Sequence, residues 1–373
     1  MLLHRVARDA SSRLQRVRTW NSRCARAFSA APMRVLFFGT DDVSVATLEK
    51  LVANSQQQDG RIVESVDVIC PSDRKVGGGR GKRQEPVPVK RVALAHGLDS
   101  FKTWEMPTRE RTYDVGVVVS FGYFLHPHML ANLAHGAVNM HPSLLPKYRG
   151  PAPIHHALLN GDATTGVSVI EIDPRAFDVG RILLQKEVPI PAAIQCRELA
   201  QQLAAFGADC VLETLGSLQQ LKASATVQDD AKASKAPKIG AQDAVLDLDT
   251  QTADHVFHRW QALSDSVGIS VRFKDRVVKL AEVRAPTRDD LSELPALLRQ
   301  SVATAAAATP TPGAFVFDKK RQALWLQCAA GSWLLVAKLQ PADRGVGSAV
   351  DFANGLRLKH ADGGVFESTR SRL

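Results

Sequence analysis

Cysteine and long hydrophobic runs are scarce in this 373-residue chain. The cysteines are Cys24, Cys70, Cys196, Cys210 and Cys328. They form no Cys-x-x-Cys pair, and no histidine stands near them at zinc-ligand spacing, so we expect free thiols and no structural metal. No stretch approaches the roughly 20 apolar residues that span a membrane, so we expect no membrane partner.

Lysine and glutamate are missing from residues 1–32, which are instead rich in arginine and serine. Seven arginines against Asp9 give this segment a net charge of +6, which leaves only +3 of the chain's +9 for the remainder. The remaining charge is therefore weak support for nucleic-acid binding. The composition of the segment is typical of a mitochondrial transit peptide, with a disordered leader as the alternative. It predicts that the protein is located in the mitochondrial matrix.

Residues 33–222 predict a first domain of the α/β class. Short apolar strand patterns cover residues 34–39, 62–70, 115–120 and 137–140, and helical patterns cover 45–52 and 126–133. Strands that alternate with helices favour a mostly parallel, Rossmann-like sheet. Two further strands are expected at 167–172 and 182–188, and a long helix at 197–221 closes the domain.

The second half of the chain predicts a smaller all-β domain, as expected for a chain too long for a single core. Residues 223–238 are polar and poor in large apolar side chains, which is typical of a linker. Five short strands follow, at 269–273, 276–283, 313–317, 323–328 and 333–339. A small antiparallel, OB-like β-barrel over 239–345 is the economical interpretation, with residues 286–312 as an inserted loop and 346–373 as a C-terminal tail.

The residues that carry chemistry are expected where strands end, because open parallel sheets bind ligands beyond the carboxyl ends of their strands. Asn139 and His141 stand two apart at such an end, so their side chains project to the same side. An amide can stabilise a developing oxyanion, and a histidine can accept a proton. A lone histidine would more often be a hydrogen-bonded loop residue. Asp178, between the two later strands, favours catalysis if its carboxylate orients the imidazole.

Asn139-x-His141, followed by the run from Ser143 to Gly150 and by Asp178-x-Gly180, resembles the formyltransferase family that uses 10-formyltetrahydrofolate. The similarity extends in order from Met33 to about residue 221. The resemblance implies that Asn139 donates to the formyl oxygen, that His141 takes the proton of the attacking amine, and that Asp178 orients His141. It also implies 10-formyltetrahydrofolate as the formyl-donor cosubstrate, with no metal.

The same resemblance implies a folate site formed by an apolar slot and the turn after the catalytic strand. Its residues would be Phe121, Tyr123, Leu125, Phe177, Ser143, Leu144, Leu145 and Pro146. The chain departs from the family at Val179, where a threonine is usual, and therefore lacks a hydroxyl beside the catalytic carboxylate.

The formyl acceptor has to be inferred from the rest of the chain. A basic, glycine-rich stretch holds five cations that we expect to contact RNA: Arg74, Lys75, Arg80, Lys82 and Arg83. The alternative is that this stretch is a solvated surface loop. Residues 238–256 and 260–283 resemble the tRNA-binding C-terminal domain of methionyl-tRNA formyltransferases. Initiator methionyl-tRNA is therefore the expected partner of a monomeric enzyme. The alternatives are a formyltransferase for a small amine, such as a sugar nucleotide or glycinamide ribonucleotide, and an idle folate- or RNA-binding module.

Overall fold

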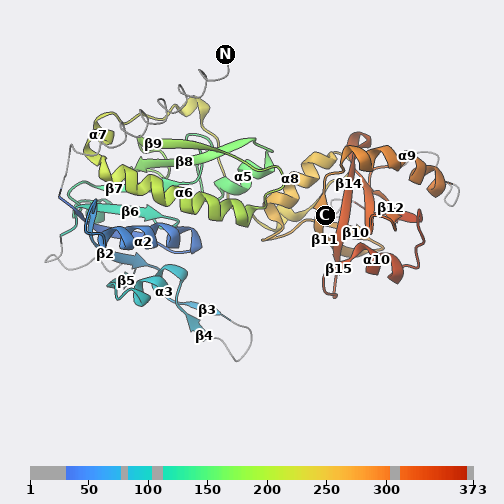
Figure 1. Cartoon of the computed structure of the whole chain (residues 1–373), viewed down its shortest axis with the longest axis horizontal. Coiled ribbons are helices and arrows are strands. Elements are labelled where there is room, and N and C mark those ends of the chain that lie inside the picture. Colours follow the sequence, from blue (N-terminus) through green and yellow to red (C-terminus); the bar gives the residue numbers. More distant parts are fainter. Residues whose placement is uncertain (1–30, 77–82, 103–111, 303–310, 368–373) are drawn as a thin grey trace, which may run out of the picture.

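A seven-stranded sheet forms the N-terminal lobe of the computed structural model, which describes residues 31–76, 83–102, 112–302 and 311–367 (Figure 1). Its strands, in sheet order, are β5 (Ser100–Lys102), β2 (Val63–Cys70), β1 (Met33–Gly39), β6 (Val115–Val119), β7 (Ala137–His141), β8 (Thr164–Glu171) and β9 (Ile182–Pro189). The first five are parallel, whereas β8 and β9 run antiparallel to their neighbours. The expected mostly parallel sheet is confirmed.

Both faces of this sheet are covered, which explains why a central strand such as β6 is apolar throughout. One face packs against α2 (Asp42–Ser55) and α6 (Cys196–Gly216), in a core that includes Phe37, Leu48 and Leu203. The other face packs against the segment after β6, through Phe121, Leu125 and Met129. The remaining helices of the lobe are α3 (Pro88–Ala95), α4 (Pro127–Leu130), α5 (Pro153–Leu159) and α7 (Leu218–Ala223).

Two helices are shorter than their sequence patterns predict. The helix expected at 126–133 is only α4, because Leu133 leaves the helix to form a bridge with Tyr113. The helix expected at 197–221 is divided into α6 and α7 at Ser217, whose φ of −130° is not helical. Glycine and serine at this point have weak helix preferences, which favours a break there.

The C-terminal lobe is an antiparallel sheet curled into a half-barrel, and it confirms the predicted barrel class. Its strands, in sheet order, are β10 (Ser270–Phe273), β11 (Arg276–Arg284), β14 (Trp333–Pro341), β13 (Ala323–Gln327), β12 (Ala314–Asp318) and β16 (Gly363–Val365), with β15 (Gly347–Ser348) beside β14. A backbone bridge between Arg272 and Glu367 joins the two outer edges.

The segment from residue 346, expected to be a tail, supplies β15, α10 (Ala349–Gly355) and β16 to this lobe. Phe366 is 1% exposed and stacks against Phe315, with ring centroids 4.4 Å apart. Strand β16 was not predicted, because Gly363 and Gly364 weaken the strand pattern in the sequence.

The insertion in the barrel contains a helix, α9 (Arg288–Val302), where we expected an extended loop. Leu294 and Leu297 are buried against the sheet. Asp290, 8% exposed, accepts hydrogen bonds from Arg284 and Arg321 at 2.6 Å each, and Thr287 caps the first turn. Burial of the leucine face and the charge network together stabilise a helix in a region rich in threonine and alanine.

The two lobes meet at α8 (Ala253–Leu263), which packs against α5 (Figure 1). Gln261 is 4% exposed, and its amide donates to the carbonyl oxygens of Ala192 (3.1 Å) and Ile194 (2.9 Å). Among the described residues, no helix is both long and apolar enough to cross a bilayer.

Candidate active site

A cavity of about 1030 Å³ lies at the carboxyl ends of the parallel strands. Strand order reverses between β1 and β6, and the residues that follow these strands, Thr40 and Ser120, both line the cavity. Such a reversal opens a crevice in which α/β proteins bind ligands. Asn139, His141 and Asp178 line this same cavity, so residues far apart in the sequence are brought together as predicted.

Strand β7 presents Asn139 and His141 to the cavity. It is hydrogen-bonded on both sides, with Asn139 opposite Val118 of β6 and Ile170 of β8. Because side chains alternate along a strand, Val138 and Met140 enter the core on the α6 side, which leaves Asn139 and His141 on the other side. Within the described part of the chain, the Asn139 amide has no hydrogen-bond partner and is available to a substrate.

The His141 imidazole is held between two acceptors and is 5% exposed. Its Nε2 is 2.9 Å from the carbonyl oxygen of Tyr148, and its Nδ1 is 3.5 Å from Oδ1 of Asp178. A carbonyl oxygen only accepts, so Nε2 carries a proton and donates it to this hydrogen bond. In the neutral ring, Nδ1 is then the nitrogen with the free lone pair, and it faces the carboxylate side of the cavity.

Asp178 is placed by an irregular loop between β8 and β9. Its φ of 58° lies in the left-handed region, which non-glycine residues seldom adopt. Its Oδ2 accepts a hydrogen bond from the Gly150 backbone N–H at 2.9 Å. Gly180 follows where the loop passes so close to β8 that a Cβ atom would stand 1.7 Å from the Glu171 carbonyl oxygen. The Asp-x-Gly spacing therefore has a steric reason.

The residues expected to bind folate fall into two groups. Phe121, Tyr123, Leu125 and Phe177 line the cavity. Phe121 and Leu125 are buried, whereas Tyr123 and Phe177 are 51% and 59% exposed at its rim. Phe177 packs edge-on against Phe124, with centroids 5.3 Å apart.

The second group, Ser143, Leu144, Leu145 and Pro146, does not line the cavity. Ser143 is fully buried, and its hydroxyl donates to the Lys147 carbonyl at 2.6 Å. Ser168 of β8 accepts from the Leu145 N–H at 3.0 Å. This turn thus braces the segment after β7, beside the cavity that Pro142 lines.

Among the residues expected to contact RNA, Arg74, Lys75 and Arg83 lie on a small hairpin of β3 (Arg74–Val76) and β4 (Arg83–Glu85). Arg74 also lines the cavity, and Lys75 is exposed. Arg83 forms an ion pair with Glu85 at 2.8 Å. Arg80 and Lys82 lie outside the described residues.

Some cavity residues were not singled out from the sequence. Ser120 has a φ of 46° and donates to Asp41 at 2.5 Å, and the Thr40 hydroxyl donates to the Phe121 carbonyl at 3.1 Å. Both follow strand ends, a position that could have identified them. His155, near the start of α5, also lines the cavity. Its pKa is lowered mainly by burial and to a smaller extent by the neighbouring His156.

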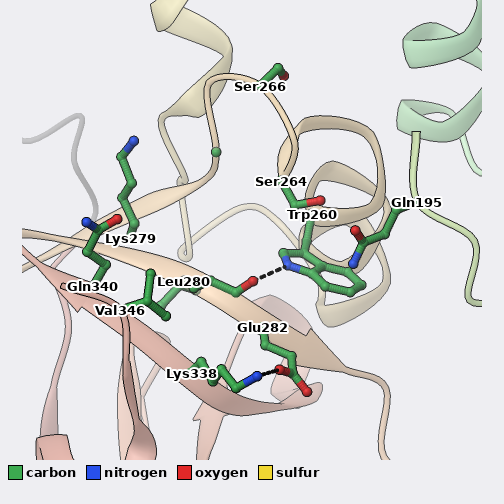
Figure 2. A pocket seen from close by; sticks show the side chains of 12 residues that line it. Gln195, Trp260, Ser264, Ser266, Lys279, Leu280, Glu282, Lys338, Gln340 and Val346 are labelled. Atoms are coloured by element: carbon green, nitrogen blue, oxygen red, sulfur yellow. Dashed lines mark hydrogen bonds and ion pairs between the residues drawn. The ribbon is translucent and has the colours of Figure 1, made fainter. Parts of the chain in front are cut away.

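A second cavity of about 510 Å³ lies between the N-cap of α6 and the C-terminal sheet (Figure 2). Lys338 and Glu282 form an ion pair at 2.7 Å on its floor, and the Trp260 indole donates to the Ala281 carbonyl at 3.1 Å. The described residues that line this cavity include amides and a carboxylate but no histidine, whereas the larger cavity combines an amide, an imidazole and a carboxylate and is therefore the candidate active site. No cluster of three or more histidine, cysteine, aspartate or glutamate side chains suited to a metal occurs in the described ranges.

Two family models match the chain in order. The formyl transferase model matches residues 33–215, and the formyl transferase C-terminal domain model matches residues 238–357. Among solved structures, the N-formyltransferase from Helicobacter canadensis, in complex with folinic acid and dTDP-3-aminofucose, superposes with a TM-score of 0.55. The match covers 82% of this chain and 98% of that one at 14% identity, which supports the fold alone.

Curated relatives of higher identity refine the family. The mitochondrial methionyl-tRNA formyltransferase of Bos taurus is 32% identical over 333 residues, covering 89% of this chain and 79% of that one. The methionyl-tRNA formyltransferase of Roseiflexus sp. (strain RS-1) is 33% identical over 335 residues, covering 88% and 94%. Both matches extend across the two lobes, and this chain therefore belongs to the methionyl-tRNA formyltransferase family of transferases.

Proposed function

We propose that this enzyme transfers the formyl group of 10-formyltetrahydrofolate to the α-amino group of methionyl-initiator tRNA in the mitochondrial matrix. The observation that carries the proposal is the convergence of Asn139, His141 and Asp178 on one cavity at the sheet edge. An enzyme that forms an amide needs a donor for the carbonyl oxygen and an acceptor for the amine proton. The three side chains supply these functions.

Each residue has a distinct part in the proposed reaction. The Asn139 amide, which has no partner among the described residues, donates to the oxygen that gains negative charge. His141 takes the amine proton at Nδ1, directly or through a water molecule, because its Nε2 is already committed to the Tyr148 carbonyl. Asp178, 3.5 Å from Nδ1, then stabilises the positive charge on the ring.

The cavity suits a folate. When bound, 10-formyltetrahydrofolate supplies the formyl carbon, and its N10 leaves as an amine once it receives the proton that His141 took from the acceptor amine. A pterin is a flat aromatic ring, and Phe121 and Leu125 offer it an apolar wall. The exposed rings of Tyr123 and Phe177 at the rim are placed to contact the more polar remainder of the cosubstrate.

The acceptor is proposed from the surroundings of the cavity and from the relatives. Arg74 reaches the cavity from the β3–β4 hairpin, and Lys75 and Arg83 lie on the same hairpin, so cations stand where an RNA acceptor end would approach. The C-terminal lobe is shared with relatives named methionyl-tRNA formyltransferase. The arginine-rich composition of residues 1–32 and the relatives named as mitochondrial support a mitochondrial location.

Formyl transfer to several acceptors tests this proposal. The enzyme is incubated with 10-formyltetrahydrofolate and, separately, with charged initiator methionyl-tRNA, charged elongator methionyl-tRNA, a dTDP-amino sugar and glycinamide ribonucleotide. We expect formylmethionine on the initiator tRNA at a kcat/KM far above that of the other acceptors. Preferential formylation of a small amine would refute the proposed acceptor, and folate binding without transfer to any acceptor would refute the proposed reaction.

A further inference from the structure

The polar segment between the lobes contacts the loop that carries Asp178 through Gln228. This side chain is 8% exposed. Its Nε2 donates to the carbonyl oxygens of Asp178 at 2.9 Å and Gly180 at 2.8 Å. Its Oε1 accepts from two nitrogen atoms of the Arg149 guanidinium, at 3.0 and 2.8 Å. Every strong hydrogen-bonding direction of the amide is used, so its orientation is fixed.

The same segment also holds the other partner of the imidazole. The hydroxyl oxygen of Ser234 accepts from the Tyr148 N–H at 2.9 Å, and the Tyr148 carbonyl accepts from His141 Nε2. Backbone hydrogen bonds continue this contact, from Arg149 N–H to the Ser234 carbonyl (2.8 Å) and from Ala236 N–H to the Arg149 carbonyl (2.7 Å). Gly150 fits only because it lacks a side chain, since a Cβ atom there would stand 2.6 Å from the Ala236 carbonyl.

Asp178 needs such support because of its backbone. A non-glycine residue with a φ of 58° persists only where its surroundings hold it. Gln228 donates hydrogen bonds to the backbone carbonyl oxygens of Asp178 and Gly180, and the Gly150 N–H donates to the Asp178 carboxylate. Without Gln228, one buried and one partly buried carbonyl oxygen lose their donor, and the loop is free to relax toward a common conformation, which turns the carboxylate away from His141.

We propose that Gln228 is a positioning residue for formyl transfer: by hydrogen bonding both carbonyls of the Asp178 loop, it keeps the Asp178 carboxylate facing Nδ1 of His141. Arg149 aligns the Gln228 amide for this purpose. The segment expected to be a linker thus supports the active site from outside the cavity. This inference rests on the proposed role of Asp178 in catalysis.

Two substitutions separate the donors of Gln228 from its contact with Arg149. Gln228→Leu removes every hydrogen bond at nearly constant size, whereas Gln228→Glu keeps the acceptor for Arg149 and removes the donors. Because a displacement of about 1 Å at a catalytic group costs on the order of 10²-fold, we expect single-turnover formylation by both variants to fall ~10- to 100-fold. The KM for folate and for tRNA should stay within about twofold. A rate within about twofold of wild type for Gln228→Glu would overturn the proposal.

A matched control exists elsewhere in the chain. Gln261 is similarly buried and also donates to two backbone carbonyls, but between the lobes. Gln261→Leu should lower the melting temperature about as much as Gln228→Leu does. Its single-turnover rate, normalised to folate-binding enzyme, should remain within about threefold of wild type. If the two variants lose activity equally, Gln228 contributes only to stability and the proposal fails.

A double-mutant cycle with Asp178→Asn completes the test. If Gln228 acts through Asp178, Gln228→Leu should lower the residual rate of Asp178→Asn by less than about threefold, because there is no carboxylate left to position. Equal fold-losses in both backgrounds would overturn the positioning role. A fully active Asp178→Asn would instead refute the proposed catalytic set, so the two failures are distinguishable.

Discussion

Replacing Asn139 with alanine is the sharpest perturbation of the proposed chemistry. The side chain lines the cavity and has no hydrogen-bond partner within the described part of the chain, so its removal leaves no buried group unpaired. We therefore expect the free energy of unfolding to change by no more than about 0.5 kcal/mol. The loss of an oxyanion donor should lower kcat by roughly 10² to 10³, equivalent to about 2.7 to 4 kcal/mol.

The assay is single-turnover formylation of charged initiator tRNA, with urea unfolding of the same samples. Asn139→Asp is the matched variant, because it keeps the size of the side chain and replaces the donor with an acceptor. Both variants should lose activity to a similar degree while folate affinity is retained. A rate for Asn139→Ala within about threefold of wild type would remove the amide from the mechanism, and a large loss of stability would show that its role is structural.

Three further predictions concern RNA binding, pH and the catalytic loop. Replacing Arg74, Lys75 and Arg83 with alanine should weaken tRNA binding and flatten its dependence on salt, measured by filter binding from about 50 to 200 mM salt, and an effect on folate affinity alone would contradict this. Hydrogen bonds from Arg284 and then Arg321 hold the pKa of Asp290 far below its usual value, so this carboxylate stabilises the fold above pH ~4 and progressively less as pH falls. Asp290→Asn should therefore destabilise the protein by on the order of 3 kcal/mol at pH 7 and by less below pH 4, whereas a pH-independent loss in thermal melts would be contrary to this account. Gly180→Ala places a methyl group 1.7 Å from a backbone carbonyl of β8, so we expect lower stability and a slower reaction together, and unchanged activity would show that the loop adapts freely.

Much of the fold is visible in the sequence because burial leaves a simple pattern. The continuous apolar run of β6 predicts a strand covered on both faces, and the structure covers it in this way. The α9 helix was not predicted, because its leucines stand in a region whose threonine, alanine and proline content is typical of a loop. Its stability comes in part from the ion pairs of Asp290 with Arg284 and with Arg321, and the Arg321 pair joins positions 31 apart, so it leaves no local signal.

The candidate site was predicted to differing degrees. The common side of Asn139 and His141 follows from the period of a strand. The approach of Asp178 does not follow from the strand period, because it depends on a loop with a positive φ and on Gly150; the sequence offered the carboxylate only as a condition, and the family resemblance supported it. The residues after β7 were assigned to the folate because they are part of the family motif; in the structure their hydrogen bonds brace the turn, and they do not line the cavity.

The positioning role of Gln228 could not be predicted from composition. It stands in a polar stretch that reads as a linker, and polar residues in linkers are usually solvated. Its function depends on burial against two carbonyl oxygens that are about 50 positions away in the sequence. Such a contact is created by tertiary structure and can be recognised only there.

The rate of formyl transfer to initiator methionyl-tRNA by Asp178→Asn, compared with wild type at saturating substrates, tests the central claim most directly. An asparagine can still accept from Gly150, but it turns an amide N–H toward the Nδ1 lone pair that is proposed to take the proton. The account predicts a loss of roughly 10²-fold or more with folate and tRNA binding retained. A variant that transfers formyl groups at the wild-type rate would contradict it.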